Sequence, residues 1–384
     1  MRKTAVSTAL ACFMIVFLTG CWNSKEIQKM AYVTAIGLDY ENGKYITYVQ
    51  VLNFSNIARG ETGEVGKNVP AWIGKGEGVT VTESFNSIYS TSQLRIFWGH
   101  VKAIVVSERF LKNSERVKEA YDMLNRYREV RYNILLYGTK EPLRDILSQK
   151  SILNLSPLDT LMDTYAQMYS QRSFILPTYG YKIIAQFNEP AVSATLPSLS
   201  IDRKSWSEDK RERPMFRIDG AYYFHAQQLT GWLSEKDLEG YRWLQTKLER
   251  SPINIPDNSS PDAAVVLIKP NVHFQYVVKH GKPYFSIHLT MMAYVDEMVR
   301  NLSKKQIEEK SAQVIKVQII ETYNKGLSIQ ADVLKLGEYL YRENPKLWQS
   351  LHHDGELIIE PDSLDSIDVK VTLMHTGKYK GRVD

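Results

Sequence analysis

The chain has 384 residues, a length that suggests two or three domains. Apolar residues make up 43% and charged residues 24% of it, a composition that predicts a packed core and excludes wholesale disorder. The formal net charge is +5, and no run of basic residues is interleaved with aromatic ones, so the sequence argues against nucleic acid as a partner.

The first twenty residues have the pattern of an export signal. Two cations, Arg2 and Lys3, precede an apolar stretch that ends at Leu18, and two small residues follow it. The apolar stretch is too short to span a bilayer comfortably, because a spanning helix needs about 20 residues. Residues 1–20 are therefore predicted to be a signal peptide. Its removal would lower the formal charge of the mature chain from +5 to +3.

Cys21 ends the run Leu18-Thr19-Gly20-Cys21, which is typical of a bacterial lipobox. At such a site the thiol receives diacylglycerol, and cleavage makes the cysteine the new N-terminus, which is then N-acylated. The alternative is an ordinary cleaved signal with an incidental cysteine. The other cysteine, Cys12, lies in the segment to be removed, so the mature chain can form no internal disulfide. We therefore expect Cys21 to carry a lipid that anchors the chain to a membrane outside the cytoplasm.

The next part of the sequence predicts a mixed α/β domain, residues 21–201. Two strands are joined by the turn Asn42-Gly43, and a glycine-rich loop, Gly60–Gly78, follows them. Helices and strands then alternate. The predicted strands and helices are Tyr32–Gly37, Tyr45–Phe54, Val79–Ser92 (helix), Val101–Val106, Arg116–Arg128 (helix), Tyr132–Tyr137 and Pro142–Leu147 (helix).

Two polar segments divide the rest of the chain. Asp202–Arg213 is rich in charges and predicts an exposed linker or the tip of a long hairpin. Ser251–Pro261, with three prolines, predicts a second linker. Between them, a strand at Arg217–Phe224 and a helix at Glu235–Leu248 would form a small middle domain, residues 214–252.

The C-terminal domain, residues 262–384, has the clearest pattern. It predicts a β-β-α-α-β unit around an antiparallel sheet, with a capping box formed by Ser303 and Gln306 at the start of the longest helix. Gly326 would close that helix, and Asp332 would cap the next one. The predicted elements are Ala264–Tyr276, Tyr284–Tyr294, the helix after Ser303, the helix Val333–Arg342 and the strand Ile367–Met374. The expected fold class is α+β, with three mixed α/β domains of largely antiparallel sheets and packed helices, joined by polar linkers.

Catalytic motifs are matched only poorly. Ser207 and Lys210 have Ser-x-x-Lys spacing, and His375-Thr376-Gly377 resembles a Lys-Thr-Gly box, but Ser207 lies in a charge-rich segment instead of opening a buried helix. Gly74–Gly78 lacks both the spacing and the preceding strand of a phosphate-binding loop, so we interpret it as a mobile loop.

Metal-binding patterns are also weak. The adjacent His352 and His353 cannot share one face of a helix. Asp362, Asp365 and Asp368 are three residues apart, whereas a calcium loop uses alternate residues and a glycine. We expect no catalytic site, no metal and no cofactor, and we predict that the chain is not an enzyme.

Several segments together resemble the C-subunit lipoproteins of spore germinant receptors, the Ger(x)C family. Asn23 stands where that family usually has Asp, a departure that removes one charge beside the lipid. The matching blocks occur in the order of the family and span nearly the whole chain. They are Cys21-Trp22-Asn23-Ser24-Lys25-Glu26-Ile27, Val33-Thr34-Ala35-Ile36-Gly37-Leu38-Asp39, Gly99-His100-Val101-Lys102 with Ser107-Glu108, and Asp332-Val333-Leu334 with Gly337, Pro345 and Trp348.

The resemblance implies a three-domain protein without enzymatic activity on the outer face of the inner spore membrane. It would assemble with two integral-membrane subunits, A and B, into a complex that senses germinants. Trp22, Glu26 and Ile27 follow the acylated cysteine and are the expected partner contacts, although they could instead form a flexible tether. Two alternatives are a lipid-anchored solute-binding protein of a transporter and a lipid-anchored cell-wall enzyme. The first should have two doubly wound domains, and the second needs a catalytic constellation.

Overall fold

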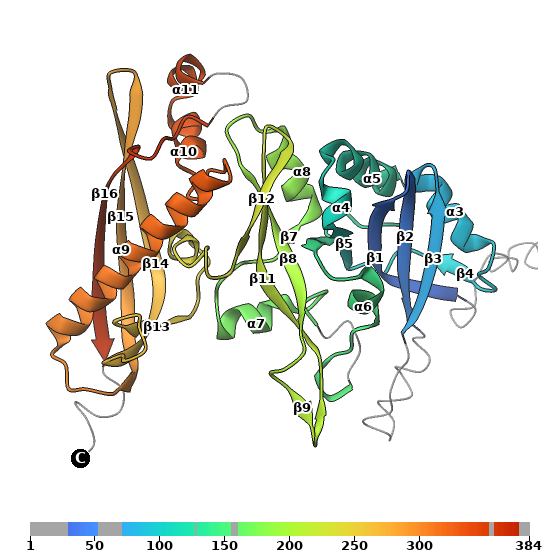
Figure 1. The fold of residues 1–384 in the computed structure, drawn as a ribbon, viewed down its shortest axis with the longest axis horizontal. Coiled ribbons are helices and arrows are strands. Elements are labelled where there is room, and N and C mark those ends of the chain that lie inside the picture. The colour runs from blue at the N-terminus through green and yellow to red at the C-terminus, as the bar shows by residue number, and fades with distance from the viewer. Residues whose placement is uncertain (1–29, 53–70, 127–128, 155–159, 353–356, 376–384) are drawn as a thin grey trace, which may run out of the picture.

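The computed structural model describes residues 30–52, 71–126, 129–154, 160–352 and 357–375. Two sheets lie side by side along the long axis of the molecule (Figure 1). The first has ten strands, eight of them in the order β12-β11-β8-β6-β5-β1-β2-β3, with β4 paired to β1 and β7 to β6. Its strands are β1 (Met30–Glu41), β2 (Lys44–Leu52), β3 (Trp72–Gly78), β4 (Arg95–Phe97), β5 (Ala103–Ser107), β6 (Leu135–Thr139), β7 (Thr178–Tyr179), β8 (Ala194–Asp202), β11 (Met215–His225) and β12 (Gln228–Ser234).

The centre of this sheet is parallel and its flanks are antiparallel. β1, β5, β6 and β8 run in the same direction, while β2, β3, β11 and β12 pair antiparallel. Central strands such as β5, which is buried at every residue, need cover on both faces, and helices supply much of it. The helices are α3 (Val81–Tyr89), α4 (Glu108–Leu111), α5 (Ser114–Arg126), α6 (Leu143–Ser148), α7 (Tyr165–Gln171) and α8 (Gly180–Asn188). The expected mixture of helices and strands is confirmed.

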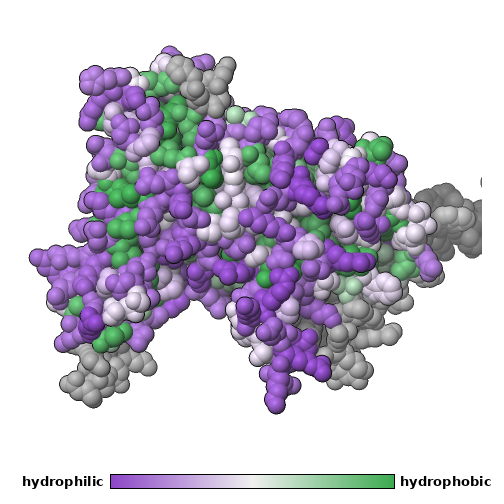
Figure 2. Space-filling view, viewed as in Figure 1, coloured by the Kyte–Doolittle hydropathy of each residue, from purple (hydrophilic) through white to green (hydrophobic). Residues whose placement is uncertain are grey.

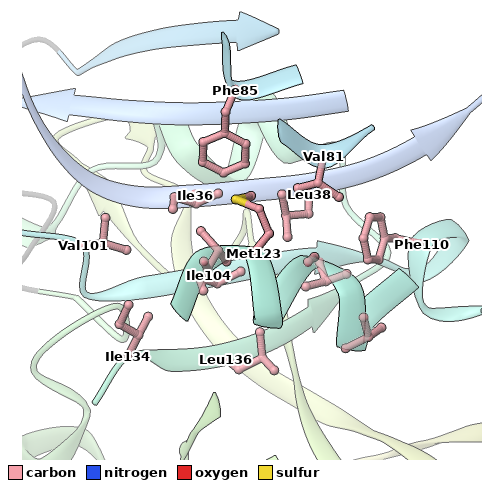
Figure 3. Close-up of a cluster of buried hydrophobic side chains, with 14 of the residues drawn as sticks. Ile36, Leu38, Val81, Phe85, Val101, Ile104, Phe110, Met123, Ile134 and Leu136 are labelled. Atoms are coloured by element: carbon pink, nitrogen blue, oxygen red, sulfur yellow. The ribbon is translucent and has the colours of Figure 1, made fainter. Parts of the chain in front are cut away.

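One face of the sheet packs on a large apolar cluster. Ile36 and Leu38 of β1 and Ile104 of β5 point toward Phe85 of α3 and Met123 of α5 (Figure 3). Successive residues of a strand point to opposite faces, so Ala35, which directly precedes Ile36, packs in a second cluster with α6. The two clusters fix the register of β1, because a shift by one residue would turn its apolar side chains to the wrong face.

The prediction of a glycine-rich loop at Gly60–Gly78 is wrong in its last part, because residues 72–78 form the strand β3. This strand pairs with β2 and packs against α3. A Cβ atom at Gly76 would lie 2.0 Å from the carbonyl oxygen of Ser84, so only glycine lets the helix backbone come this close. Gly74–Gly78 is thus part of a sheet and not a mobile loop. The rest of the predicted loop, before residue 71, lies outside the described residues.

Replacing Gly76 by alanine is expected to lower the free energy of unfolding by about 1–3 kcal/mol, since the added methyl group has no space. Lys75→Ala is the matched control, because the Lys75 side chain is 46% exposed on the same strand. Urea unfolding of both variants tests the packing of β3 on α3. Equal stability of the two variants would contradict it.

For the segment Asp202–Arg213 the sequence predicts either a linker or a hairpin tip, and the structure shows the hairpin tip. β8 and β11 pair antiparallel up to Asp202 and Met215, and the short strands β9 (Ser207–Glu208) and β10 (Arg211–Glu212) continue beyond them. Figure 2 shows this tip as almost uniformly hydrophilic. The strands β11 and β12, which follow this tip, therefore extend the first sheet. The predicted helix Glu235–Leu248 is wrong, because only the single 3-10 turn η3 (Tyr241–Leu244) forms there.

Limited proteolysis should cut this tip first. Lys204, Lys210 and Arg211 are exposed and offer trypsin accessible backbone. The measurement is mass spectrometry of the first fragments after a brief digest. A first cut within residues 304–328, which form a long helix, would contradict the assignment.

The second sheet has four strands in the order β13-β14-β15-β16. β14 (Ala263–Lys279) and β15 (Lys282–Met298) form the predicted hairpin, turning at His280 and Gly281, which both have positive φ. The prediction of a second linker at Ser251–Pro261 is wrong for its first residues, because Ser251–Ile255 forms β13, which pairs with β14.

Three helices connect β15 to the last strand. β16 (Leu364–His375) pairs parallel to β15, so the prediction of a purely antiparallel sheet is wrong for this pair. The crossover through α9 (Lys304–Ser328), α10 (Leu336–Glu343) and α11 (Pro345–Leu351) returns the chain to the end where β15 began, as a parallel pair requires. The capping box of Ser303 and Gln306 is confirmed. The helix extends two residues past Gly326.

Candidate functional site

The predicted lipidation site, Cys21, and the predicted contacts Trp22, Glu26 and Ile27 lie outside the described residues. The described chain begins at Met30, the first residue of β1, which pairs with Arg95 of β4. Met30 is nine residues after Cys21, and nine residues span at most about 30 Å. The part of the fold within reach of Cys21 is therefore the end of the first sheet that carries β4. We call this the β4 end and define it as residues 30–32, 72, 89–98, 122–126, 129–135 and 179–182.

A cleft of about 860 Å³ opens at the β4 end. Its wall includes Leu94, Ile96 and Met123, so part of it is apolar. The carboxylate of Glu129 lies 3.5 Å from the guanidinium of Arg95 and accepts a hydrogen bond from the backbone N–H of Trp98 at 3.3 Å. These groups can hold a ligand or a partner, but they include no nucleophile beside a general base.

Two sequence blocks of the family resemblance, those that start at Val33 and at Gly99, meet in the structure. The backbone N–H of Lys102 donates to the carbonyl oxygen of Thr34 at 2.8 Å, and β1 pairs with β5. The buried carboxylate of Asp39 accepts hydrogen bonds from the Ser107 hydroxyl and from Nη2 of Arg109, the latter at 2.5 Å. The bond to Asp39 raises the pKa of the Arg109 guanidinium. This network joins β1 to the start of α4, so its role is structural.

The block that starts at Asp332 builds the junction between the two sheets. The buried carboxylate of Asp332 accepts hydrogen bonds from the backbone N–H groups of Leu336 and Gly337, at 3.0 and 2.6 Å. Its own backbone N–H donates to the hydroxyl of Ser193, just before β8, at 2.8 Å. Burial raises the pKa of Asp332 to about 6 despite these hydrogen bonds. Asp332 therefore accepts from the first backbone N–H groups of the helix, but the predicted start is wrong, because α10 begins at Leu336 and its N-cap residue is Lys335. Asp332 also fastens the C-terminal helices to the first sheet.

A second polar bridge at this junction was not predicted from the sequence. Gln318 of α9 accepts a hydrogen bond from the indole nitrogen of Trp243 at 2.9 Å and donates one to Glu239 at 3.0 Å. The backbone N–H of Gly240 donates to the hydroxyl of Thr322 at 2.9 Å. A glutamine and a threonine among the apolar residues of the α9 stripe were the signal for it, because a buried polar side chain needs a partner.

A smaller pocket, of about 290 Å³, lies beside α7 and the end of β8. Arg172 and Arg217 both form ion pairs with the carboxylate of Glu235, at 2.7 Å for Arg217. The hydroxyl of Tyr169 is buried, and burial raises its pKa, so it stays protonated at neutral pH. The cations of this pocket are already paired, which leaves no free charge to select a ligand.

The weak catalytic and metal patterns remain apart in space. Ser207 lies in β9 and Lys210 in the turn after it, both exposed, so neither has the buried environment that activates a nucleophile. His352 stacks on Trp348 with ring centres 4.2 Å apart, and His353 lies outside the described residues.

The three aspartates singled out in the sequence, Asp362, Asp365 and Asp368, do not form a metal site either. Asp362 accepts a hydrogen bond from the hydroxyl of Tyr284 at 3.2 Å, and Asp368 lies 3.6 Å from Nδ1 of His288. Within the described ranges, no three side chains of His, Cys, Asp or Glu are placed to hold a metal ion. Nor does any described helix have the length and apolar character needed to cross a membrane.

Comparisons with known proteins agree with this architecture. Residues 23–201 match the family described as spore germination protein N-terminal domain, and residues 219–377 match the family described as spore germination B3/GerAC like, C-terminal. Spore germination protein KC of Bacillus subtilis is 22% identical over 98% of this chain and 97% of its own length. Spore germination protein B3 of the same organism is 20% identical over 96% of this chain and 98% of its own.

A solved structure supports the fold independently. The crystal structure of the GerBC protein superposes with a TM-score of 0.50 at 16% identity, over 88% of this chain and 96% of that one. The two family matches flank the β9–β10 hairpin and together take in both sheets. The chain therefore belongs to the GerAC-like, or Ger(x)C, family of spore germination proteins.

Proposed function

We propose that this chain is a non-enzymatic, lipid-anchored C-subunit of a spore germinant receptor that is needed for nutrient-triggered germination. The observation that carries the proposal is the length of the family match, which runs through both sheets at residues 23–201 and 219–377. Relatives named as spore germination proteins match over nearly their whole length, so their role is the best guide to the role of this chain.

The proposed anchor is a diacylglycerol with an N-acyl chain on Cys21, and no other cofactor is proposed. Several acyl chains hold a protein on a membrane stably. The proposed location is the outer face of the inner spore membrane, and the proposed partners are the integral-membrane A and B subunits. A chain without catalysis acts only through contacts that favour one state of its partners over another.

The first partner contacts are proposed at Trp22, Glu26 and Ile27, because they follow the anchored cysteine directly. Reversing the charge at Glu26 or truncating Ile27 should reduce receptor abundance and germination without lowering the stability of the purified mature chain. The control is His352→Ala with His353→Ala, since no metal or catalytic role is proposed for either residue and His352 stacks on Trp348. A germination defect in this control, with normal folding and assembly, would reveal a site outside the proposed contacts.

Affinity capture of the tagged protein from detergent-solubilised spore membranes tests the assembly. We expect two integral-membrane proteins to co-purify in constant ratio. Capture with the permease and ATPase of a transporter would overturn the proposal in favour of the solute-binding alternative. That alternative also predicts tight binding of amino acids or sugars by the isolated mature chain, which isothermal titration measures.

The architecture supports the receptor subunit over the solute-binding protein. A solute-binding protein should have two doubly wound domains built from repeated β-α-β units. The second sheet here is built instead on the long β14–β15 hairpin, with a single parallel pair between β15 and β16. The first sheet carries antiparallel strands on both flanks of its parallel centre.

A further inference from the structure

Exposed aromatic side chains gather at the β4 end. Among the described residues, five Trp or Tyr side chains are exposed, and all but Trp206 lie at this end. Trp72 and Tyr132 stand out most, with 69% and 72% of their surface exposed, and the apolar Leu94 is 48% exposed beside them. The four aromatic residues are Trp72, Tyr89, Tyr132 and Tyr181.

Strand register places these side chains at one end of the sheet. Trp72 begins β3 opposite Val51, which pairs with Val33 near the start of β1. Tyr132 lies three residues before β6, a strand parallel to β1 and β5, so it lies at the same end. Its ring contacts that of Tyr181, with centres 5.8 Å apart. Tyr89 and Leu94 line the cleft beside β4.

Cations are interspersed with these rings. Arg95, Arg126, Arg131 and Lys182 are all exposed, and the nearby carboxylates are those of Glu129 and Asp122. The positive charge of Arg131 helps to lower the pKa of His100, after the larger effect of burial. The β4 end therefore carries a net positive charge among its exposed aromatic side chains.

We propose that the β4 end lies on the surface of an anionic bilayer, with its aromatic rings at the level of the lipid headgroups. This inference rests on the proposed lipid anchor at Cys21, since a tether of at most about 30 Å keeps Met30 near the membrane. Trp and Tyr are the side chains that favour the bilayer interface. Lys and Arg side chains near an anionic leaflet are attracted to it.

The arrangement fits a lipid surface better than a protein partner. A protein interface would also be enriched in Trp, Tyr and Arg, but its core is closely packed and poor in other charged residues. Here the most exposed rings lie on separate elements, Trp72 on β3 and Tyr132 in the loop before β6, and exposed Arg and Lys side chains lie in the same surface. Figure 1 shows β4 at one end of the long axis and the four-stranded sheet at the other.

The test uses the full mature chain with its lipid on Cys21. Acylation blocks the Cys21 thiol and Cys12 is removed with the signal, so one introduced cysteine is the only reactive thiol. A fluorophore sensitive to polarity is attached to Leu94→Cys, Tyr132→Cys or, as the matched exposed control, Trp206→Cys. Each protein is reconstituted into vesicles of phosphatidylglycerol and phosphatidylcholine, with and without nitroxide-labelled lipid.

The probes at positions 94 and 132 should shift their emission to shorter wavelength and lose intensity with nitroxide lipid, while the probe at 206 should do neither. Adding Arg95→Gln and Arg131→Gln should reduce the quenching, and this reduction should vanish in phosphatidylcholine vesicles, which lack net charge.

Three results would overturn the proposal. The first is a lipidated chain that is bound to the vesicles but whose probes at 94 and 132 behave like the one at 206. This result refutes the membrane contact of the β4 end and leaves the lipid anchor intact. Shielding of those probes only after membrane subunits are added shows a protein contact instead. Absence of lipid on Cys21 by mass spectrometry refutes the anchor itself, and the membrane contact with it.

Discussion

Labelled palmitate should enter the wild-type protein and should not enter the Cys21→Ala variant. After signal removal Cys21 is the only thiol in the chain, so its loss removes the only attachment point for diacylglycerol. Each buried CH₂ of an acyl chain contributes about 0.8 kcal/mol, and the loss of all chains should release the isolated protein from vesicles. Incorporation of label is the decisive measurement, because partner subunits could retain an unlipidated chain on the membrane.

Cys12→Ala is the matched control for this experiment. It changes a cysteine nine residues earlier, inside the predicted signal, and should leave labelling unchanged. A labelled Cys21→Ala protein would refute the lipobox interpretation. It would also remove the basis for orienting the β4 end toward the bilayer.

The second large effect is expected at Asp332, where stability should depend on pH. The folded-state pKa is about 6, above the usual 3.8, because the carboxyl is buried. The folded protein therefore holds this proton more tightly than the unfolded chain does, and stability from this group falls as pH rises from about 4 to about 6. The difference between the two pKa values corresponds to about 3 kcal/mol in the free energy of unfolding. Urea unfolding at a series of pH values measures the fall.

Asp332→Asn isolates this contribution from other titrating groups. The asparagine amide does not titrate. The decrease in the free energy of unfolding between pH 4 and pH 6 should therefore be smaller in the variant, by the contribution of Asp332. His225 and His352 line the same small cavity as Asp332 and are left unchanged in this variant. Asp365→Asn, an exposed carboxylate at the start of β16, is the control and should leave the pH profile unchanged. Identical profiles for Asp332→Asn and the wild type would contradict the assigned pKa.

Asp332→Ala separates the hydrogen bonds from the charge. At pH 4, where the carboxyl is protonated in the fold, its removal leaves two backbone N–H groups without their acceptor. This should cost about 2–4 kcal/mol. The cost should shrink toward pH 7, because the variant also escapes the burial of a negative charge.

The elements that could be predicted from the sequence are those whose determinants are local. The β14–β15 hairpin has alternating apolar residues around a turn, and Ser303 with Gln306 specifies the start of α9 without reference to the rest of the chain. The contact of Asp332 with the start of α10 is local for the same reason, since both N–H donors lie within five residues of its carboxylate. Its second role, at the junction with Ser193, depends on packing and could not be predicted.

The errors occur where distant residues decide the structure. Residues 235–248 have helical spacing, yet a Cβ atom at Gly240 would lie 2.3 Å from the Gln318 carbonyl oxygen, so the segment follows the shape of α9. β3 is rich in glycine because α3 lies against it, a cause that composition alone does not reveal. The direction of β16 depends on where three helices bring the chain back, which no local pattern encodes.

The lipidation site and its neighbours, Trp22, Glu26 and Ile27, are predictions from motif and position alone, because they lie outside the described residues. By contrast, the exposed rings of the β4 end could not be found from the sequence. Trp72, Tyr89 and Tyr132 are far apart along the chain, and only the register of the sheet brings them to one end.

The pairing of β8 with β11 crosses the point where the two family matches divide the chain. Thr195 to Asp202 on one side face Met215 to Tyr223 on the other, so the division runs through a ladder of backbone hydrogen bonds. Neither half is a finished module for expression or exchange between receptors. A fragment ending at residue 201 would present β8 as a bare edge, and such edges recruit strands from other molecules. Chimaeras between relatives should therefore be joined within the exposed β9–β10 tip, where both strands keep their partners.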